Sequence, residues 1–281
     1  MRRIQASEVT NTVARLFEHS CYYLPPDVIA ALKQAKKKEK SPACRDVLEK
    51  ILENIEIAGK EQIPICQDTG VAVVMLELGQ QVRITGGDLY TAVNEGVRQG
   101  YHKGYLRKSI VSQPCSARVN TEDNTPAMIY TDIVPGDSLK ISVLPKGAGS
   151  ENCSRLTVLT PVEGRKGVID FVVNLVDEFG SNPCPPVIIG VGIGGTTERA
   201  MLIAKKALLR KVGQPNSDPE VAGLERELLE KVNNLGIGAM GYGGTVTALA
   251  VHVETFPCHI ASLPVAVNMQ CWCTRRAEAI L

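Results

Sequence analysis

The first sixty residues carry hydrophobic positions at helical spacing. Val13, Leu16 and Phe17 fall on one face of a predicted helix. Proline-containing starts at Leu24-Pro-Pro-Asp27 and at Ser41-Pro42 predict two further helices, because proline is favoured in the first helical turn. Residues 1–60 are therefore expected to form a helical lead-in to the rest of the chain.

Beyond residue 60 the pattern changes to short apolar runs that end at glycine, proline or cysteine. Runs of this length, bounded by turn residues, predict strands. The predicted strands cover residues 71–77, 127–133, 139–144, 187–195, 245–253 and 264–268. Those at 127–133 and 139–144 are expected to form a hairpin around Pro135-Gly136-Asp137. Helices are predicted over residues 88–103, 168–180, 196–210 and 224–235.

This order of elements predicts an α/β fold. A helical N-terminal segment is followed by a mixed α/β unit whose strands lead into glycine-rich and cysteine-bearing loops. The sequence contains no internal repeat, no low-complexity tract and no flexible linker, so one domain over residues 1–281 is expected.

Composition narrows the class of protein. The formal net charge is only +1, so neither nucleic acid nor a membrane surface is expected as a partner. No apolar run reaches the roughly 20 residues of a membrane helix. The basic N-terminus lacks the apolar segment of a secretory signal, so a cytoplasmic location is expected.

The chain is rich in cysteine. The nine cysteines are Cys21, Cys44, Cys66, Cys115, Cys153, Cys184, Cys258, Cys271 and Cys273. An odd number at long spacings, without a secretory signal, does not favour a disulfide framework. No C-x-x-C pair is present, so a zinc knuckle has no support. Buried thiols and a metal cluster held by distant loops both remain open.

The loop Cys66-Gln-Asp-Thr-Gly70, before an apolar strand, combines several chemically useful groups. A thiolate is a soft metal ligand, an amide can orient a polar substrate, and a carboxylate can move a proton. Taken alone, these residues favour a buried structural cysteine beside an Asx turn. Arg107 could anchor a carboxylate and His259 could transfer a proton, although a surface arginine and a structural histidine are the commoner cases.

Two glycine-rich segments resemble nucleotide-binding loops only superficially. Lys146-Gly-Ala-Gly-Ser-Glu-Asn152 can present N–H groups to an anion but lacks P-loop spacing. Gly190-Val-Gly-Ile-Gly-Gly195 misses the dinucleotide spacing and has no acidic residue about 20 positions on. A nicotinamide enzyme is therefore disfavoured.

Cys66, Cys184 and Cys271 share one context. Each lies in a loop beside a predicted strand, next to Pro, Gly, Asn or Gln. Three thiolates can hold a [4Fe–4S] cluster and leave one iron without a protein ligand, and that iron can act as a Lewis acid. Spacing alone does not demonstrate such a cluster.

Four ordered motifs together resemble a known family. They are Pro64-Ile-Cys-Gln-Asp-Thr-Gly70, Lys146–Asn152, Asn182-Pro-Cys-Pro-Pro186 with Gly190–Thr196, and Gln270-Cys-Trp-Cys-Thr-Arg-Arg276. They resemble the iron–sulfur hydro-lyases, which comprise class I fumarate hydratases and L(+)-tartrate dehydratases. The resemblance covers essentially the whole chain, and the chain looks like the separate alpha subunit of the two-subunit form.

The resemblance implies a site. Its cluster ligands would be Cys66, Cys184 and Cys271, its substrate contacts Gln67, Arg107 and Gly149, and its catalytic residues Asp68 and His259. A beta subunit would complete the site, in an α2β2 heterotetramer that binds a dicarboxylate substrate. Cys258 and Cys273 compete with Cys271 as third ligand, and Cys153 stands where the family would have another residue.

The expected function follows from the resemblance. It is the reversible hydration of fumarate to (S)-malate by an alpha subunit acting with its beta subunit. The first alternative is L(+)-tartrate dehydratase, which forms oxaloacetate. The second is a non-catalytic binding subunit of the same fold, although neither Asp68 nor a ligand cysteine is lost.

Overall fold

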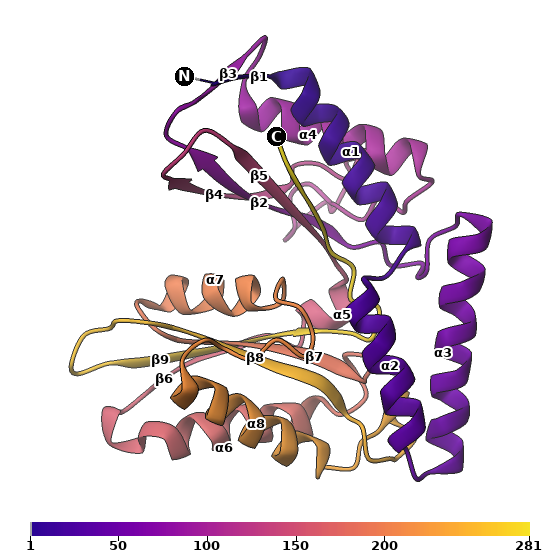
Figure 1. Cartoon of the computed structure of the whole chain (residues 1–281), viewed down its shortest axis with the longest axis vertical. Coiled ribbons are helices and arrows are strands. Elements are labelled where there is room, and N and C mark those ends of the chain that lie inside the picture. The colour runs from indigo at the N-terminus through magenta and orange to yellow at the C-terminus, as the bar shows by residue number, and fades with distance from the viewer. Residues whose placement is uncertain (1) are drawn as a thin grey trace. The chain divides into compact units, whose positions relative to one another are not determined.

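A computed structural model describes residues 2–281 and divides the chain into two compact units (Figure 1). The first unit contains residues up to Pro25, then Asn54–Ala148 and Arg275–Leu281. The second contains Pro26–Glu53 and Gly149–Thr274. Neither unit is a continuous segment, because the chain passes from one to the other four times. Because the two units interleave in this way, no single flexible linker separates them in the sequence.

The first unit is built on a four-stranded mixed sheet in the order β10-β5-β2-β4. These strands are Ala277–Ile280, Leu139–Lys146, Val71–Gly79 and Met128–Val134. Helices α1 (Ala6–Tyr22) and α4 (Leu89–Lys103) pack on the sheet, and their apolar faces form its core with Val74, Leu76 and Ile141. A small parallel pair, β1 (Arg2–Gln5) and β3 (Val82–Thr85), completes the unit. The side chain of Asp88 caps α4 by accepting the N–H groups of Tyr90 and Thr91.

The predicted hairpin in this unit is wrong. Both β4 and β5 pair with β2, β4 in parallel and β5 antiparallel, so β2 lies between them. The physical reason is the apolar character of β2, whose residues Ala72–Leu76 are all buried. A central position gives such a strand hydrogen-bonded neighbours on both edges.

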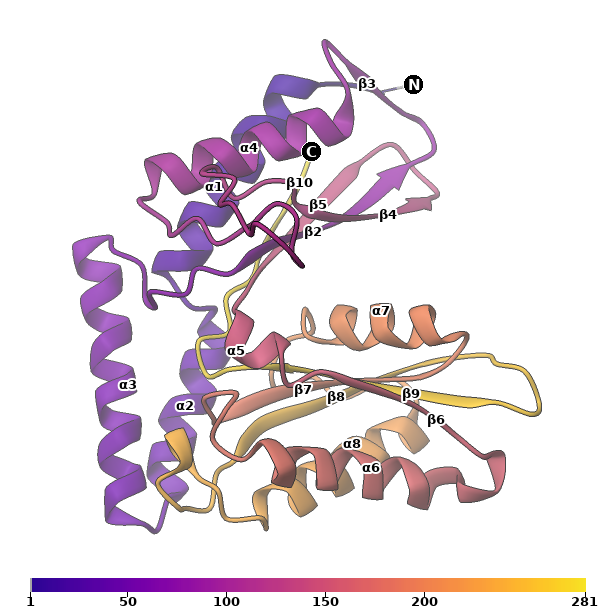
Figure 2. The same ribbon diagram turned by 180° about the vertical axis from the view of Figure 1, so that it is seen from behind.

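The second unit is built on a four-stranded sheet in the order β6-β9-β7-β8. These strands are Arg155–Leu159, Leu263–Gln270, Val187–Gly194 and Ala248–Phe256. Helix α7 (Thr197–Ala207) covers one face, and α6 (Gly164–Phe179) and α8 (Pro219–Asn233) cover the other (Figure 2). The unit also holds α2 (Pro26–Lys38), most of the short α5 (Ala148–Glu151) and the first part of α3 (Pro42–Glu61).

Glycines on β7 allow close packing of α7. A Cβ at Gly190 would lie 2.1 Å from the Ala204 carbonyl oxygen, and one at Gly192 would lie 2.1 Å from that of Ala200. Real Cβ atoms do not approach backbone oxygens so closely, so these positions require glycine. The glycine pattern that resembles a dinucleotide fingerprint therefore has a packing role.

A buried carboxylate secures a further glycine-rich loop, residues 236–244. Glu39 is 1% exposed, and its carboxylate accepts the backbone N–H groups of Thr245 and Val246. Burial alone would raise the pKa of Glu39, but hydrogen bonds, mainly from backbone N–H groups, outweigh it and hold the pKa below its ordinary value. This contact ties the end of α2 to the residues that lead into β8.

Among residues 2–281, no helix combines the length and apolarity needed to cross a bilayer.

Candidate functional site

The Cys66 loop is held in the first unit by backbone contacts on its N-terminal side. The N–H of Ile65 donates to the Cys21 carbonyl at 3.0 Å, and the side-chain amide of Asn54 donates to the Ile65 carbonyl at 3.0 Å. Cys66 itself is half-buried, and its Sγ lies 3.3 Å from Oε1 of Gln67. The fold therefore presents the thiol and the amide next to each other.

Asp68 has a fixed orientation because both of its carboxylate oxygens accept backbone hydrogen bonds. Oδ1 accepts from the N–H of Gly70 at 3.0 Å, and Oδ2 accepts from the N–H of Ala148 at 2.8 Å. A Cβ added at Gly147 would lie 3.1 Å from Asp68 Oδ2 and 3.5 Å from Arg275 Nη2. The carboxylate and the guanidinium thus flank the same glycine, and each Asp68 oxygen keeps a second lone pair.

The backbone of the next turn is fixed from α4. The hydroxyl of Tyr101, on a side chain with no exposed surface, donates to the carbonyls of Thr69 at 2.8 Å and Gly70 at 3.1 Å. Gly70 has φ +78°, and a Cβ there would lie 2.5 Å from the Lys146 carbonyl carbon. Only glycine fits this close approach of the two loops.

Arg107 lies beside the same turn. Its carbonyl accepts the Thr69 hydroxyl at 2.9 Å, which places residue 107 next to the Cys66 loop. The side chain is exposed and makes no ion pair or hydrogen bond with another described residue. A guanidinium of this kind can receive a carboxylate from solution with two parallel hydrogen bonds.

Sequence reasoning missed the buried side chains of Arg275 and Tyr101 behind this turn. Burial raises the pKa of the Cys21 thiol to about 11, although the nearby Arg275 guanidinium opposes that shift. Arg275 is 1% exposed and belongs to a motif singled out in the sequence, but its burial has no local signature. Tyr101 had no sequence signal beyond its place on a predicted helix.

In the second unit, Cys184 and Cys271 lie at the same end of the sheet. Antiparallel pairing sets Gln270, the last residue of β9, opposite Ile188 near the start of β7. The N–H of Trp272 then donates to the Cys184 carbonyl at 3.1 Å. Cys184 has φ +56°, a left-handed conformation that costs a non-glycine residue roughly 1–2 kcal/mol. Such conformations gather at functional sites.

The loop containing Gly149 lies at this end as well. A Cβ at Gly149 would lie 3.7 Å from the Asn182 carbonyl oxygen, and the Gly149 carbonyl lies 3.3 Å from the Cys153 sulfur. The loop is anchored through Glu151, whose carboxylate accepts from Lys205 Nζ at 2.5 Å and from Asn268 Nδ2 at 2.9 Å. Gly149 is exposed, so its backbone can meet a ligand.

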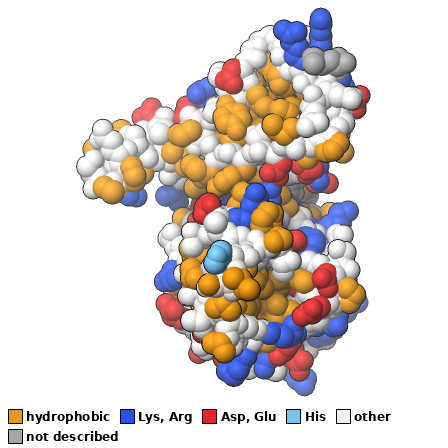
Figure 3. Space-filling view, turned by 90° about the vertical axis from the view of Figure 1, so that its left-hand side faces the viewer, with side chains coloured by type: hydrophobic (Ala, Val, Ile, Leu, Met, Phe, Trp, Pro, Cys, Tyr) orange, Lys and Arg blue, Asp and Glu red, His pale blue; other side chains and the backbone are white. Residues whose placement is uncertain are grey.

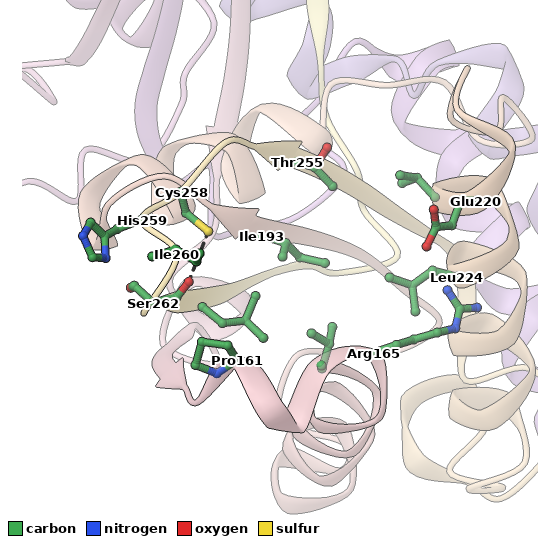
Figure 4. Close-up of a pocket in the computed structure, with 14 residues that line it drawn as sticks. Pro161, Arg165, Ile193, Glu220, Leu224, Thr255, Cys258, His259, Ile260 and Ser262 are labelled. Atoms are coloured by element: carbon green, nitrogen blue, oxygen red, sulfur yellow. Dashed lines mark hydrogen bonds between the residues drawn. The ribbon is translucent and has the colours of Figure 1, made fainter.

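His259 lies in the turn between β8 and β9, at the opposite end of β9 from Cys271. The eight residues of β9 separate them by about 26 Å at the usual rise per strand residue. His259 and Cys258 border a pocket of about 420 Å³, in which Cys258 Sγ donates to the Ser262 carbonyl (Figure 4). Hydrophobic side chains gather over this end of the unit (Figure 3). Within this unit the fold does not bring His259 or Cys258 to Cys184.

Exposure divides the nine thiols into three groups. Cys115 and Cys258 are exposed, and Cys21, Cys44, Cys153 and Cys273 are buried. The remaining three are half-buried, and they are Cys66, Cys184 and Cys271. Among residues 2–281, no three His, Cys, Asp or Glu side chains converge in the manner of a single-ion site.

Comparisons with known proteins give a consistent picture. Residues 10–280 match the family described as fumarate hydratase (Fumerase). The chain is 44% identical over 275 residues to the "Putative L(+)-tartrate dehydratase subunit alpha" of Methanocaldococcus jannaschii, with 96% of each chain covered. It is 33% identical over 279 residues to the L(+)-tartrate dehydratase subunit alpha of Escherichia coli O157:H7, covering 98% of this chain and 91% of that relative.

Proposed function

This chain belongs to the fumarate hydratase family, and we propose that it is the alpha subunit of a [4Fe–4S] hydro-lyase that interconverts fumarate and (S)-malate. The observation that carries the proposal is the exposure of the thiols. A cluster ligand must be shielded from bulk water and still reach a cofactor, and Cys66, Cys184 and Cys271 are the three half-buried cysteines. Cys273 is 1% exposed and Cys258 lies at the far end of β9, so neither suits the third position as well.

These residues fit the cofactor by chemistry as well as by exposure. Thiolates are the usual ligands of iron–sulfur clusters, and each proposed thiol sits in a loop fixed by backbone hydrogen bonds. When bound, a cluster with one iron lacking a protein ligand supplies a Lewis acid for the substrate hydroxyl and carboxylate.

Protein groups are proposed to bind the substrate and to transfer its proton. The exposed guanidinium of Arg107 would bind one substrate carboxylate, and N–H groups near Gly149 together with the Gln67 amide would orient the rest. Asp68 would hold or move a proton through the second lone pair of a carboxylate oxygen, since backbone hydrogen bonds already fix its orientation. Arg275, beside the same glycine, would add positive charge for a dianionic substrate.

His259 enters the proposal differently. If it contacts substrate, as the resemblance implies, its distance from Cys271 along β9 means that it must serve a site in another copy of the chain. A beta subunit is proposed to supply further groups in an α2β2 assembly, in keeping with the "subunit alpha" names of the relatives. A cytoplasmic location completes the proposal, because reduced thiols need a reducing compartment.

L(+)-tartrate is the second candidate substrate. The relatives that are 44% and 33% identical both carry tartrate dehydratase names, whereas the family is described as fumarate hydratase. The two substrates, (S)-malate and tartrate, differ by one hydroxyl group, so the protein groups that read this hydroxyl decide the outcome.

Anaerobic reconstitution with iron and sulfide tests the proposal. The chain should take up a cluster with visible absorbance and, with its partner subunit, turn over fumarate and (S)-malate faster than L-tartrate. Cys184→Ser and Cys271→Ser should lose the absorbance, while the matched control Cys258→Ser should keep it. A chain that binds no iron under these conditions would refute the cluster, and faster turnover of tartrate would reverse the choice of substrate.

A further inference from the structure

The side chain of Gln270 is a buried amide without hydrogen-bond partners among residues 2–281. Gln270 is the last residue of β9, directly before Cys271, and none of its side chain is exposed. Neither Oε1 nor Nε2 has a partner within the described chain. Leaving a buried polar group unpaired costs about 1–3 kcal/mol, so two such atoms in one side chain call for an explanation.

The orientation of Gln270 follows from the alternation of side chains along β9. Ala266 packs against Ala200 and Ala204 of α7, so residues 266, 268 and 270 face the α7 side of the sheet. Val267 and Met269 belong to the opposite core, beneath α6 and α8. Gln270 therefore faces away from the larger apolar core of this unit.

The neighbouring amide on this face is already engaged. Asn268 Nδ2 donates to Glu151 Oε2 at 2.9 Å and to Ser154 Oγ at 2.6 Å, which ties β9 to the loop containing Gly149. The Oδ1 atom of Asn268 has no hydrogen-bond partner in the described part of the chain. Among the described residues, three buried polar atoms without hydrogen-bond partners thus lie on one face of β9, and the two of Gln270 are at the end of the strand directly before Cys271.

We infer that the Gln270 amide is a hydrogen-bonding group for the occupant of the proposed cluster site, and that it finds its partners only when that site is filled. This inference rests on the proposed function. The occupant's chemistry suits the amide, because sulfide and thiolate sulfurs accept N–H donors and an amide oxygen can accept from bound water or a hydroxyl group. Gln270 is thus a positioning residue that holds the cofactor through hydrogen bonds, and these hydrogen bonds tune the electronic properties of the cofactor.

The alternative explanation is that Gln270 is a core residue whose side-chain amide is poorly paired and has no role in binding. The two explanations predict different effects on the cofactor when Gln270 is replaced by methionine, which has similar volume and no strong hydrogen-bonding group. If Gln270 only lacks hydrogen-bond partners, the replacement should stabilise the protein and leave the binding of the cofactor unchanged. If Gln270 binds the occupant, the replacement should not lower the stability of the protein without the cofactor, but it should weaken the binding of the cofactor.

The test compares Gln270→Met and Gln270→Leu with wild type and with Met269→Leu, a volume-conserving change at the adjacent buried residue on the opposite face. Three quantities are measured on the full chain, one before reconstitution and two after it. They are the melting temperature before reconstitution, the rate of iron release to a ferrous chelator, and the electron paramagnetic resonance spectrum of the reduced cluster.

Both Gln270 variants should melt no lower than wild type before reconstitution. After it, they should release iron about tenfold faster, in line with the 10–100-fold loss of affinity that removal of groups surrounding metal ligands produces. Their spectrum should also shift, while Met269→Leu matches wild type. Iron release within twofold of wild type, or equal acceleration in Met269→Leu, overturns the inference alone. A wild-type chain that takes up no cluster overturns the proposed function and this inference with it.

Discussion

Replacing Tyr101 by phenylalanine removes one hydroxyl from beneath the Cys66 loop. That hydroxyl donates to the carbonyls of Thr69 and Gly70, and the ring packs 5.7 Å from that of Phe17. Phenylalanine keeps the ring contact. The Gly70 carbonyl keeps a donor in the Asn124 side-chain amide at 3.2 Å, whereas the Thr69 carbonyl loses its hydroxyl donor.

The expected cost comes from two effects. A net hydrogen bond contributes about 1 kcal/mol, and a buried carbonyl left without its donor adds about 1 kcal/mol or more. A loss of about 2 kcal/mol should lower the melting temperature by about 3–4 °C, because an unfolding entropy of about 2.1 cal/mol/K per residue amounts to about 0.6 kcal/mol/K for 281 residues. Burial, with a smaller contribution from Cys21, raises the pKa of Tyr101 well above its ordinary value, so the phenol stays protonated and the effect should be equal at pH 6 and pH 9.

Thermal unfolding followed by circular dichroism measures this shift. Tyr105→Phe is the matched control, because it makes the same chemical change four residues away on a side chain that is 90% exposed. A Tyr101→Phe protein that melts within 1 °C of the Tyr105→Phe protein would show that the hydroxyl does not stabilise the turn.

Three other predictions concern the elements around the site. Gly70→Ala should destabilise far more than Gly213→Ala, because both positions have positive φ but a Cβ at Gly213 would meet no atom of the described residues within 4 Å. Equal urea unfolding midpoints for the two variants would contradict the clash with Lys146. Glu39→Gln should unfold at lower urea concentration at pH 7; because the folded pKa is depressed, the wild-type advantage should shrink as pH falls below about 4.5, and a constant difference down to pH 3 would argue against it. Lys205→Met should lower the melting temperature and slow turnover by loosening α5, whereas Lys166→Met, at a side chain 84% exposed, should do neither; equal effects would exclude the anchoring role.

The sequence predicts what local chemistry determines. Asp88 as a helix cap and Pro26 as a helix start are recognisable because their partners lie within one turn. The pairing of β4 and β5 was mispredicted because β2, more than fifty residues before β4, competes with their hairpin. Strand β10 has too short an apolar pattern to be recognised before its pairing with β5 is known.

The candidate site shows the same division. Cys66, Asp68 and Arg107 are candidates by residue type and resemblance, and in the structure Arg107 lies next to the turn of Cys66 and Asp68 through a hydrogen bond from Thr69. The burial of Arg275 and the unpaired side-chain amide of Gln270 among the described residues could not be predicted, because both depend on neighbours distant in sequence. The separation of His259 from Cys271 depends on the direction of β9, which is a property of the sheet and not of either residue.

The interleaving of the two units also has a consequence for biosynthesis. The edge strand β10 and the buried Arg275 come from residues 275–281, and the whole stretch 149–274 is translated between them and their partners in the first unit. The first unit therefore cannot complete its sheet on the ribosome until the second has been made. Chains stalled within residues 149–274 would expose an unpaired β5 edge, a form suited to capture by chaperones.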